Sequence, residues 1–126
     1  MKLFLLFSHA LTPAQERDAH ISLGVEQFCY LPEKLQQRWS QVPPEPENIT
    51  EIAQPIWDWL TKVTTPGDHV LVQGDFGMTY ATVHHAFQLG LIPVYATTRR
   101  ESQEVQLPDG SVRKTLVFAH VRFRKY

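Results

Sequence analysis

The segment from residue 70 to residue 79 combines residue types that can hold an anionic ligand. The apolar run Val70-Leu71-Val72 opens directly into Gln73-Gly74-Asp75-Phe76-Gly77 and then into a helical pattern that begins with Met78-Thr79. In an open parallel sheet, the loop after a strand directs backbone N–H groups and the N-terminus of the next helix at a bound anion. The glycine spacing fits neither the dinucleotide fingerprint nor the Walker A motif, which disfavours both ligand classes. In an alternative interpretation, the glycines only make a tight turn and Asp75 only caps the helix.

Two other apolar runs end in side chains with comparable chemistry. Ser8-His9 follow the run 3–7, and Thr97-Thr98-Arg99-Arg100 follow the run 92–96. An imidazole can accept or release a proton near neutral pH, and a guanidinium can hold a phosphate through two charge-assisted hydrogen bonds. We therefore expect the three polar strand exits to form one shared crevice. The alternatives are a structural loop histidine and an ordinary solvated basic turn.

Composition and motif content argue against several classes of protein. The 12 basic and 13 acidic residues nearly cancel, so the overall charge does not favour binding to duplex nucleic acid or to an anionic membrane. The single cysteine, Cys29, excludes an internal disulfide and fits a reducing compartment. We find no signal peptide and no run of the roughly 18 apolar residues that could span a bilayer, so we expect a cytoplasmic protein.

The sequence contains none of the motifs of metal-assisted hydrolysis and no serine–histidine–aspartate arrangement. RNA can nevertheless be cleaved without a metal ion, because its own 2′-hydroxyl attacks the adjacent phosphorus when the chain is bent into line. A protein then has to supply geometry and positive charge. The expected site therefore contains no metal.

The elements that must position these residues follow from hydrophobic periodicity and from turn signals. Continuous apolar runs predict strands covered on both faces, and residues repeating every three or four positions predict helices. Thr12-Pro13-Ala14-Gln15 has the pattern of a capping box at the start of a helix that Gly24 ends. The expected order is a strand at 3–7, a helix from 13, a strand at 25–31, helices at 32–42 and from about 50, a strand at 70–72, a helix ending at Gly90, a strand at 92–96, a hairpin turn at 107–111 and a strand at 116–126. This order predicts one domain, residues 1–126, with a doubly wound, mainly parallel α/β sheet and an antiparallel hairpin at its C-terminal edge.

Four segments resemble a family of small CRISPR-associated Csx proteins of type III systems. They are LFLLFSHALTPAQ with DAHISLGV, then QGDFGMTY, GLIPVYATTRR and the terminal HVRFRKY, and the resemblance runs nearly from end to end. It implies a Rossmann-like fold related to the CARF domains that sense cyclic oligoadenylates. It also implies a ring nuclease, which binds cyclic tetra-adenylate as a homodimer and cuts it to linear products ending in 2′,3′-cyclic phosphate. Such an enzyme switches off the antiviral response and needs no cofactor.

Applied to this chain, the resemblance implies that three loops face the ligand: Ser8-His9, residues 73–79 and residues 97–100. The chemistry of their side chains suggests the role of each. We expect Arg99 or Arg100 to hold phosphate and offset transition-state charge, and His9 to remove or deliver a proton. Adenine rings would stack on Phe76 or Tyr80. The expected substrate-binding residues are Ser8, Gln73, Gly74, Asp75, Phe76, Gly77, Thr79, Thr97 and Thr98. A four-nucleotide ring on a two-fold axis would receive the same loops from each subunit.

Two other functions remain open from the sequence. The same loops could belong to a binding protein that sequesters the ring without cutting it. Alternatively, the chain could regulate a CRISPR effector through protein contacts. Trp57 is then a candidate anchor, because it lies off the helix face on which Trp39 and Trp59 are expected to pack into the core.

Overall fold

Five strands form one sheet in the order β2-β1-β3-β4-β5, in which the first four strands are parallel and β5 is antiparallel to β4. The computed structural model describes all residues from 1 to 126. The elements are β1 (Lys2–Leu6), α1 (Pro13–Asp18), the π-helical turn η1 (Ala19–Leu23), β2 (Gln27–Tyr30), α2 (Glu33–Ser40), α3 (Thr50–Val63), β3 (His69–Val72), α4 (Phe76–Gln88), β4 (Ile92–Gln106) and β5 (Val112–Lys125). The predicted α/β class, with a mainly parallel sheet and an antiparallel C-terminal hairpin, is confirmed.

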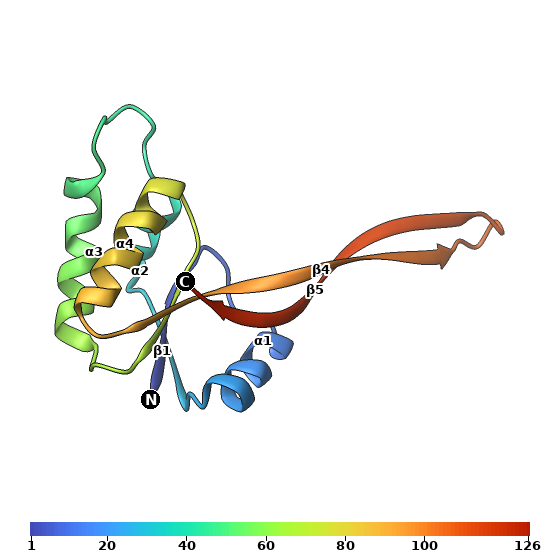
Figure 1. The fold of residues 1–126 in the computed structure, drawn as a ribbon. Coiled ribbons are helices and arrows are strands. Elements are labelled where there is room, and N and C mark those ends of the chain that lie inside the picture. The colour runs from blue at the N-terminus through green and yellow to red at the C-terminus, as the bar shows by residue number, and fades with distance from the viewer.

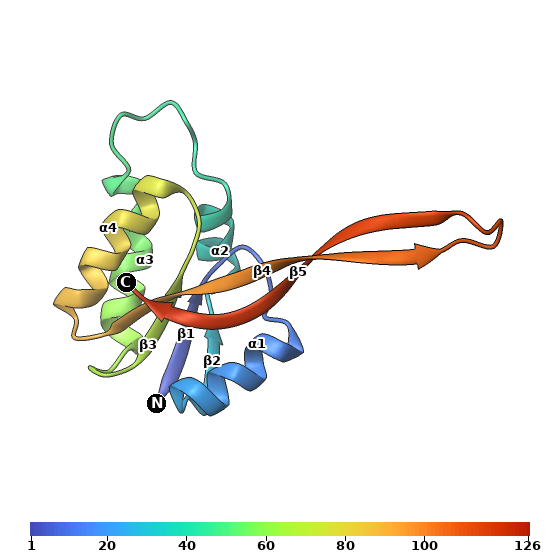
Figure 2. The ribbon, with the colours of Figure 1, turned by 45° about the vertical axis from the view of Figure 1, so that its right-hand side comes forward.

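Helices cover both faces of the sheet, which explains why β1 is apolar at successive positions (Figures 1 and 2). Leu3 and Leu5 point into the core beneath α1 and η1, whereas Phe4 and Leu6 point into the core beneath α2, α3 and α4. All four side chains are buried. No helix of this fold has the length and hydropathy that a membrane crossing needs.

Three local sequence signals predict the structures that are found at their positions. Thr12 caps α1 and exchanges the two hydrogen bonds of a capping box with Gln15. Gly24 ends η1 in the left-handed region, with φ of 67°. The turn at 107–111 closes the C-terminal hairpin, where the Leu107 N–H donates to the Ser111 carbonyl at 2.8 Å. Strand and helix ends differ from the expected bounds by a few residues.

The prediction that the fourth strand ends at Ala96 is wrong. β4 continues to Gln106 and pairs with β5 along its whole length, so the sheet edge extends into a long two-stranded projection (Figures 1 and 2). We call residues 98–120 of this hairpin the arm. The pairing register between β4 and β5 shifts between Thr97 and Thr98, where the arm begins. On the α1 side, His120 Nε2 lies 2.7 Å from Asp18 Oδ2, which fastens the base of the arm to the body.

The tryptophans pack inside the helical layer. Trp39 is buried, and Trp59 packs edge-to-face on Phe4. Trp57 donates its Nε1–H to the Thr82 hydroxyl at 3.0 Å and stacks on a histidine of α4. Trp57 therefore joins α3 to α4 and is partly buried against the core; its part in a protein contact stays a prediction.

Candidate functional site

The chain turns to opposite sides of the sheet after β1 and after β3, and these two strands are neighbours. Such a switch point leaves a crevice at the carboxyl ends of the strands, where ligands bind in open α/β sheets. Here a shallow pocket of about 300 Å³ is lined by Phe7, Ser8, His9, Gln73 and Gly74. The structure thus brings the first two predicted loops together. We call this hollow the switch-point pocket.

Trp39 shapes the turn at Gln73-Gly74 from below. Its Nε1–H donates to the Gln73 carbonyl at 3.0 Å. A Cβ on Gly74 would lie 2.8 Å from the same nitrogen, so only glycine fits without movement. The Gln73 side chain accepts a hydrogen bond from the Ala96 N–H at 2.7 Å, which ties the turn to β4.

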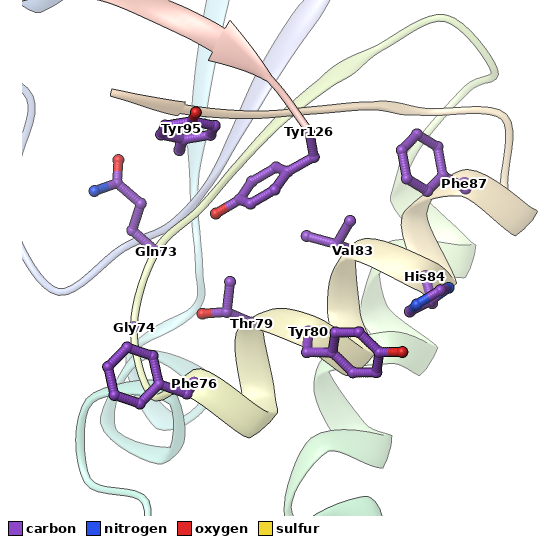
Figure 3. Close-up of a pocket in the computed structure, with 10 residues that line it drawn as sticks. All are labelled: Gln73, Gly74, Phe76, Thr79, Tyr80, Val83, His84, Phe87, Tyr95 and Tyr126. Atoms are coloured by element: carbon purple, nitrogen blue, oxygen red, sulfur yellow. The ribbon is translucent and has the colours of Figure 1, made fainter. Parts of the chain in front are cut away.

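An aromatic groove adjoins the switch-point pocket and shares Gln73 and Gly74 with it. The groove encloses about 620 Å³, which falls within the usual range for small-molecule sites. It lies between α4 and the start of β4 (Figure 3). Its lining comprises Gln73, Gly74, Phe76, Thr79, Tyr80, Val83, His84, Phe87, Tyr95 and Tyr126. The Phe76 side chain is 94% exposed, so a flat ring system has free access to it.

Two tyrosines form the wall of the groove on the sheet side. Tyr126 and Tyr95 pack with their ring centroids 4.9 Å apart. The Tyr126 hydroxyl donates to the Val72 carbonyl, which fixes the ring across the end of β3. Burial raises the pKa of Tyr126 above its usual value, so its hydroxyl remains a donor through neutral pH. Arg124 reaches the rim and donates from Nη1 to the Tyr95 hydroxyl at 3.1 Å.

Thr79 contributes an unsatisfied polar atom to the groove. Its Oγ1 is buried and has no hydrogen-bond partner in the chain. Figure 3 shows Thr79 on the first turns of α4, facing the space between Phe76 and Tyr126. A buried hydroxyl without a partner is unfavourable, and a polar ligand group could supply the missing bond.

Asp75 is the helix cap of α4, as the alternative interpretation of this residue stated. Its Oδ2 accepts a hydrogen bond from the Met78 N–H at 3.1 Å. The carboxylate thus occupies one of the donors that an anion would use at this helix end. The N–H groups of Phe76 and Gly77, in the first turn of α4, have no intrahelical acceptor and remain oriented toward that end.

The third predicted loop lies outside both the switch-point pocket and the aromatic groove, which corrects the expectation of one shared crevice. Neither is lined by Thr97, Thr98, Arg99 or Arg100. They continue β4 because β5 pairs with them: Arg99 lies opposite Ala119, and Thr97 donates its hydroxyl to the Arg122 carbonyl at 2.9 Å. The Arg100 guanidinium lies over the ring of Phe118, 5.5 Å from its centroid. Both arginines are exposed on the arm.

Sequence reasoning named half of the residues that line the groove, Gln73, Gly74, Phe76, Thr79 and Tyr80, and missed the other half, Val83, His84, Phe87, Tyr95 and Tyr126. Tyr80 and Phe87 are both exposed, and the side chains of α4 that enter the core are Met78, Thr82, Val83 and Ala86. The usable signal was the four-residue spacing of Phe76, Tyr80 and His84, which puts them on one face. No comparable signal marks Tyr126.

Comparisons with known proteins give one family. The model of a family described as "Uncharacterized protein MJ1673 family" matches residues 1–124. A protein of Methanocaldococcus jannaschii, described as "Uncharacterized protein MJ1673", is 46% identical over 125 residues, covering 99% of this chain and 96% of that relative. No solved structure matches the chain.

Proposed function

This chain belongs to the MJ1673 family, and from the geometry of its site we propose that it is a ring nuclease that binds cyclic tetra-adenylate and cleaves it without a metal ion. The observation that carries the proposal is the junction at Gln73-Gly74, where the aromatic groove meets the switch-point pocket. The groove offers exposed rings for an adenine base, and the pocket offers a hydroxyl and an imidazole beside it. The resemblance to Csx ring nucleases and to CARF domains supports the same ligand.

Each part of the ligand has a matching surface. Adenine stacks on Phe76 or Tyr80, because aromatic faces hold bases with little dependence on their edges. The Thr79 hydroxyl supplies a bond to the base or the ribose. The phosphate lies against Ser8 and the free N–H groups at the start of α4. A four-nucleotide ring is far larger than one groove, so one subunit holds only part of it and two subunits related by a two-fold axis share it.

Cleavage proceeds by internal transfer. The 2′-hydroxyl of one ribose attacks the adjacent phosphorus, the bond from phosphorus to the 5′-oxygen breaks, and a 2′,3′-cyclic phosphate forms. The proton of the 2′-hydroxyl is removed, and a proton is delivered to the leaving 5′-oxygen. His9 is the side chain of the pocket that can serve either step. No water is consumed and no metal ion is required.

A second candidate function, sequestration of the ring without cleavage, is favoured by the charge of the pocket. No lysine or arginine lines the switch-point pocket. The negative charge that develops on the phosphate in the transition state is then offset, within one subunit, only by cations that reach the rim of the groove. Binding requires less positive charge than cleavage, so a sponge fits this lining.

Incubation with cyclic tetra-adenylate in the presence of EDTA, followed by chromatography of the products, separates the two functions. We expect linear products that end in 2′,3′-cyclic phosphate, whereas a sponge returns the intact ring. H9A should lose cleavage and keep binding, and F76A should lose binding. I21A changes an exposed apolar residue on η1 and is the matched control. Loss of turnover on chelation would exclude the metal-independent mechanism.

A further inference from the structure

We propose that a third hollow, next to Tyr30 at the end of β2, binds a second adenine, so that each subunit holds two consecutive nucleotides of the ring. This hollow encloses about 240 Å³ and is lined by Tyr30, Leu31 and Gln36 together with residues 7–10. We call it the Tyr30 hollow. The inference deepens the proposed function and takes the identity of the ligand from it, but it does not require that the ligand be cleaved.

The three hollows follow one another along a single edge of the sheet. β2, β1 and β3 are parallel neighbours, so their carboxyl ends lie at the same edge (Figure 2). The Tyr30 hollow shares residues 7–9 with the switch-point pocket. The switch-point pocket in turn shares Gln73 and Gly74 with the aromatic groove. The switch-point pocket therefore lies between the other two.

This order of surfaces matches the order of groups in a dinucleotide, which carries one phosphate between two bases. Ser8 and His9 line both the switch-point pocket and the Tyr30 hollow. A phosphate held at these two residues thus has the aromatic groove on one side and the Tyr30 hollow on the other. The volume of the Tyr30 hollow is below the roughly 300–1,000 Å³ of sites that take a whole small molecule, which suits a single base.

Tyr30 offers a ring on which this base can stack. The residue is 45% exposed. The Leu11 N–H donates to the Tyr30 hydroxyl at 3.2 Å, which ties the ring to the loop that carries Ser8 and His9. A ring that is already held in place does not have to be ordered when a base stacks on it, so less free energy is lost on binding.

The side-chain amide of Gln36 selects for adenine. Its Nε2 donates to the Phe7 carbonyl at 2.8 Å and to the Ser40 hydroxyl at 3.2 Å, so both of its N–H groups are used. The Oε1 atom remains as the acceptor that this side chain offers to a ligand. Adenine presents its 6-amino group as a donor, whereas guanine presents a carbonyl oxygen at the same position. The Tyr30 hollow should therefore prefer adenine to guanine.

Two nucleotides per subunit account for the whole ring. A four-nucleotide ring on a two-fold axis divides into two identical halves, and each half is a dinucleotide. With the aromatic groove alone, one base of each half has no surface of its own. The Tyr30 hollow supplies that surface, and it places the phosphate between the two bases next to His9.

The first test compares two ligands on the unmodified protein by isothermal titration calorimetry. The probe is 2′-O-methyladenylyl-(3′→5′)-adenosine, whose methyl group removes the attacking hydroxyl. The reference ligand is 2′-O-methyladenosine 3′-(methyl phosphate), which has the same charge and lacks the second nucleoside. We expect one probe per chain and an affinity for the reference that is about 5–150-fold weaker, because this is what stacking of one base on an aromatic ring contributes.

The second test locates the second base with variants. Y30A should lower the affinity for the probe about 5–150-fold, whereas Y30F keeps the ring and should keep the affinity. Purine riboside, which lacks the 6-amino group, should cost about fivefold at one of the two positions of the probe. Q36L should bind that analogue and the probe equally. Q37L should still discriminate between them, because Gln37 is the next residue of α2 and lies outside the hollow.

Circular dichroism verifies that each variant is folded, and the comparison of ligands on the unmodified protein needs no variant. Equal affinities for the probe and the reference overturn the proposal, as does the absence of saturable binding or a folded Y30A with unchanged affinity. If the ring is cleaved and Y30A binds the probe normally, the proposed function stands and the second base is refuted. If the ring is returned intact and Y30A binds the probe weakly, cleavage is refuted and the second base stands.

Discussion

Replacing Gly74 by alanine should destabilise the fold by distorting the floor of the candidate site. The new Cβ would lie 2.8 Å from Nε1 and 3.0 Å from Cε2 of the Trp39 side chain, which is buried and has little room to move. Overpacking of this kind costs about 1–3 kcal/mol. Displacing Trp39 also weakens its 3.0 Å bond to the Gln73 carbonyl, a loss of about 1 kcal/mol. The free energy of unfolding should fall by about 2–4 kcal/mol in total.

Urea unfolding followed by tryptophan fluorescence measures this change, with G77A as the matched control. Gly77 stands three residues later, in the first turn of α4, where an added Cβ makes only an ordinary contact of 3.5 Å with Asp75 Oδ2. G77A should be neutral or more stable by about 0.5–1 kcal/mol, because alanine favours a helix over glycine. Equal unfolding midpoints for G74A and the unmodified protein would refute the role given to Trp39.

Three other substitutions test single contacts. Burial raises the pKa of Asp18, but hydrogen bonds from Ser22 and His120 and the charge of His120 outweigh it and lower the pKa overall. This carboxylate therefore stabilises the fold at pH values above the pKa of unfolded aspartate, about 4. Its contribution is lost as the pH falls through the lowered pKa of the folded state. The urea midpoint of D18N should therefore drop less between pH 6 and pH 3 than that of the unmodified protein. T79V removes a buried hydroxyl that has no hydrogen-bond partner, so the melting temperature should stay the same or rise. The affinity for cyclic tetra-adenylate, measured by titration, should fall. D75A removes the cap of α4 and should lower the free energy of unfolding by about 1 kcal/mol, with D75N retaining most of it.

The sequence predicts the parts of this fold that depend on local interactions. The capping box at Thr12, the left-handed Gly24 and the hairpin turn at 107–111 each involve residues a few positions apart, so their signals are complete within a short window. The meeting of Ser8 and Gln73 was also predictable, because strand order in a doubly wound sheet brings such ends together.

The arm was not predictable from local pattern. Residues 97–104 are almost entirely polar, which favours a loop, yet they stay in β4 because β5 supplies backbone partners along their length. Half of the residues that line the aromatic groove were missed for a related reason. Helical periodicity shows that Tyr80 and Val83 lie near one another but not where the core boundary runs between them, and Val83 is buried while Tyr80 is exposed.

Dilution should separate binding from cleavage if the proposed site is shared between subunits. One subunit supplies the groove, the imidazole of His9 and the helix end, which suffice to hold part of a ring. Charge that develops on the phosphate during cleavage needs a cation, and the arginines of the arm lie outside the groove of their own chain. Turnover per subunit should therefore fall as the protein is diluted below its dimer dissociation constant, and more steeply at high salt, which weakens contacts between exposed charges. A turnover per subunit that stays constant through the dimer-to-monomer transition would mean that one chain carries all the charge the reaction needs, with Arg124 at the rim as the residue to test next.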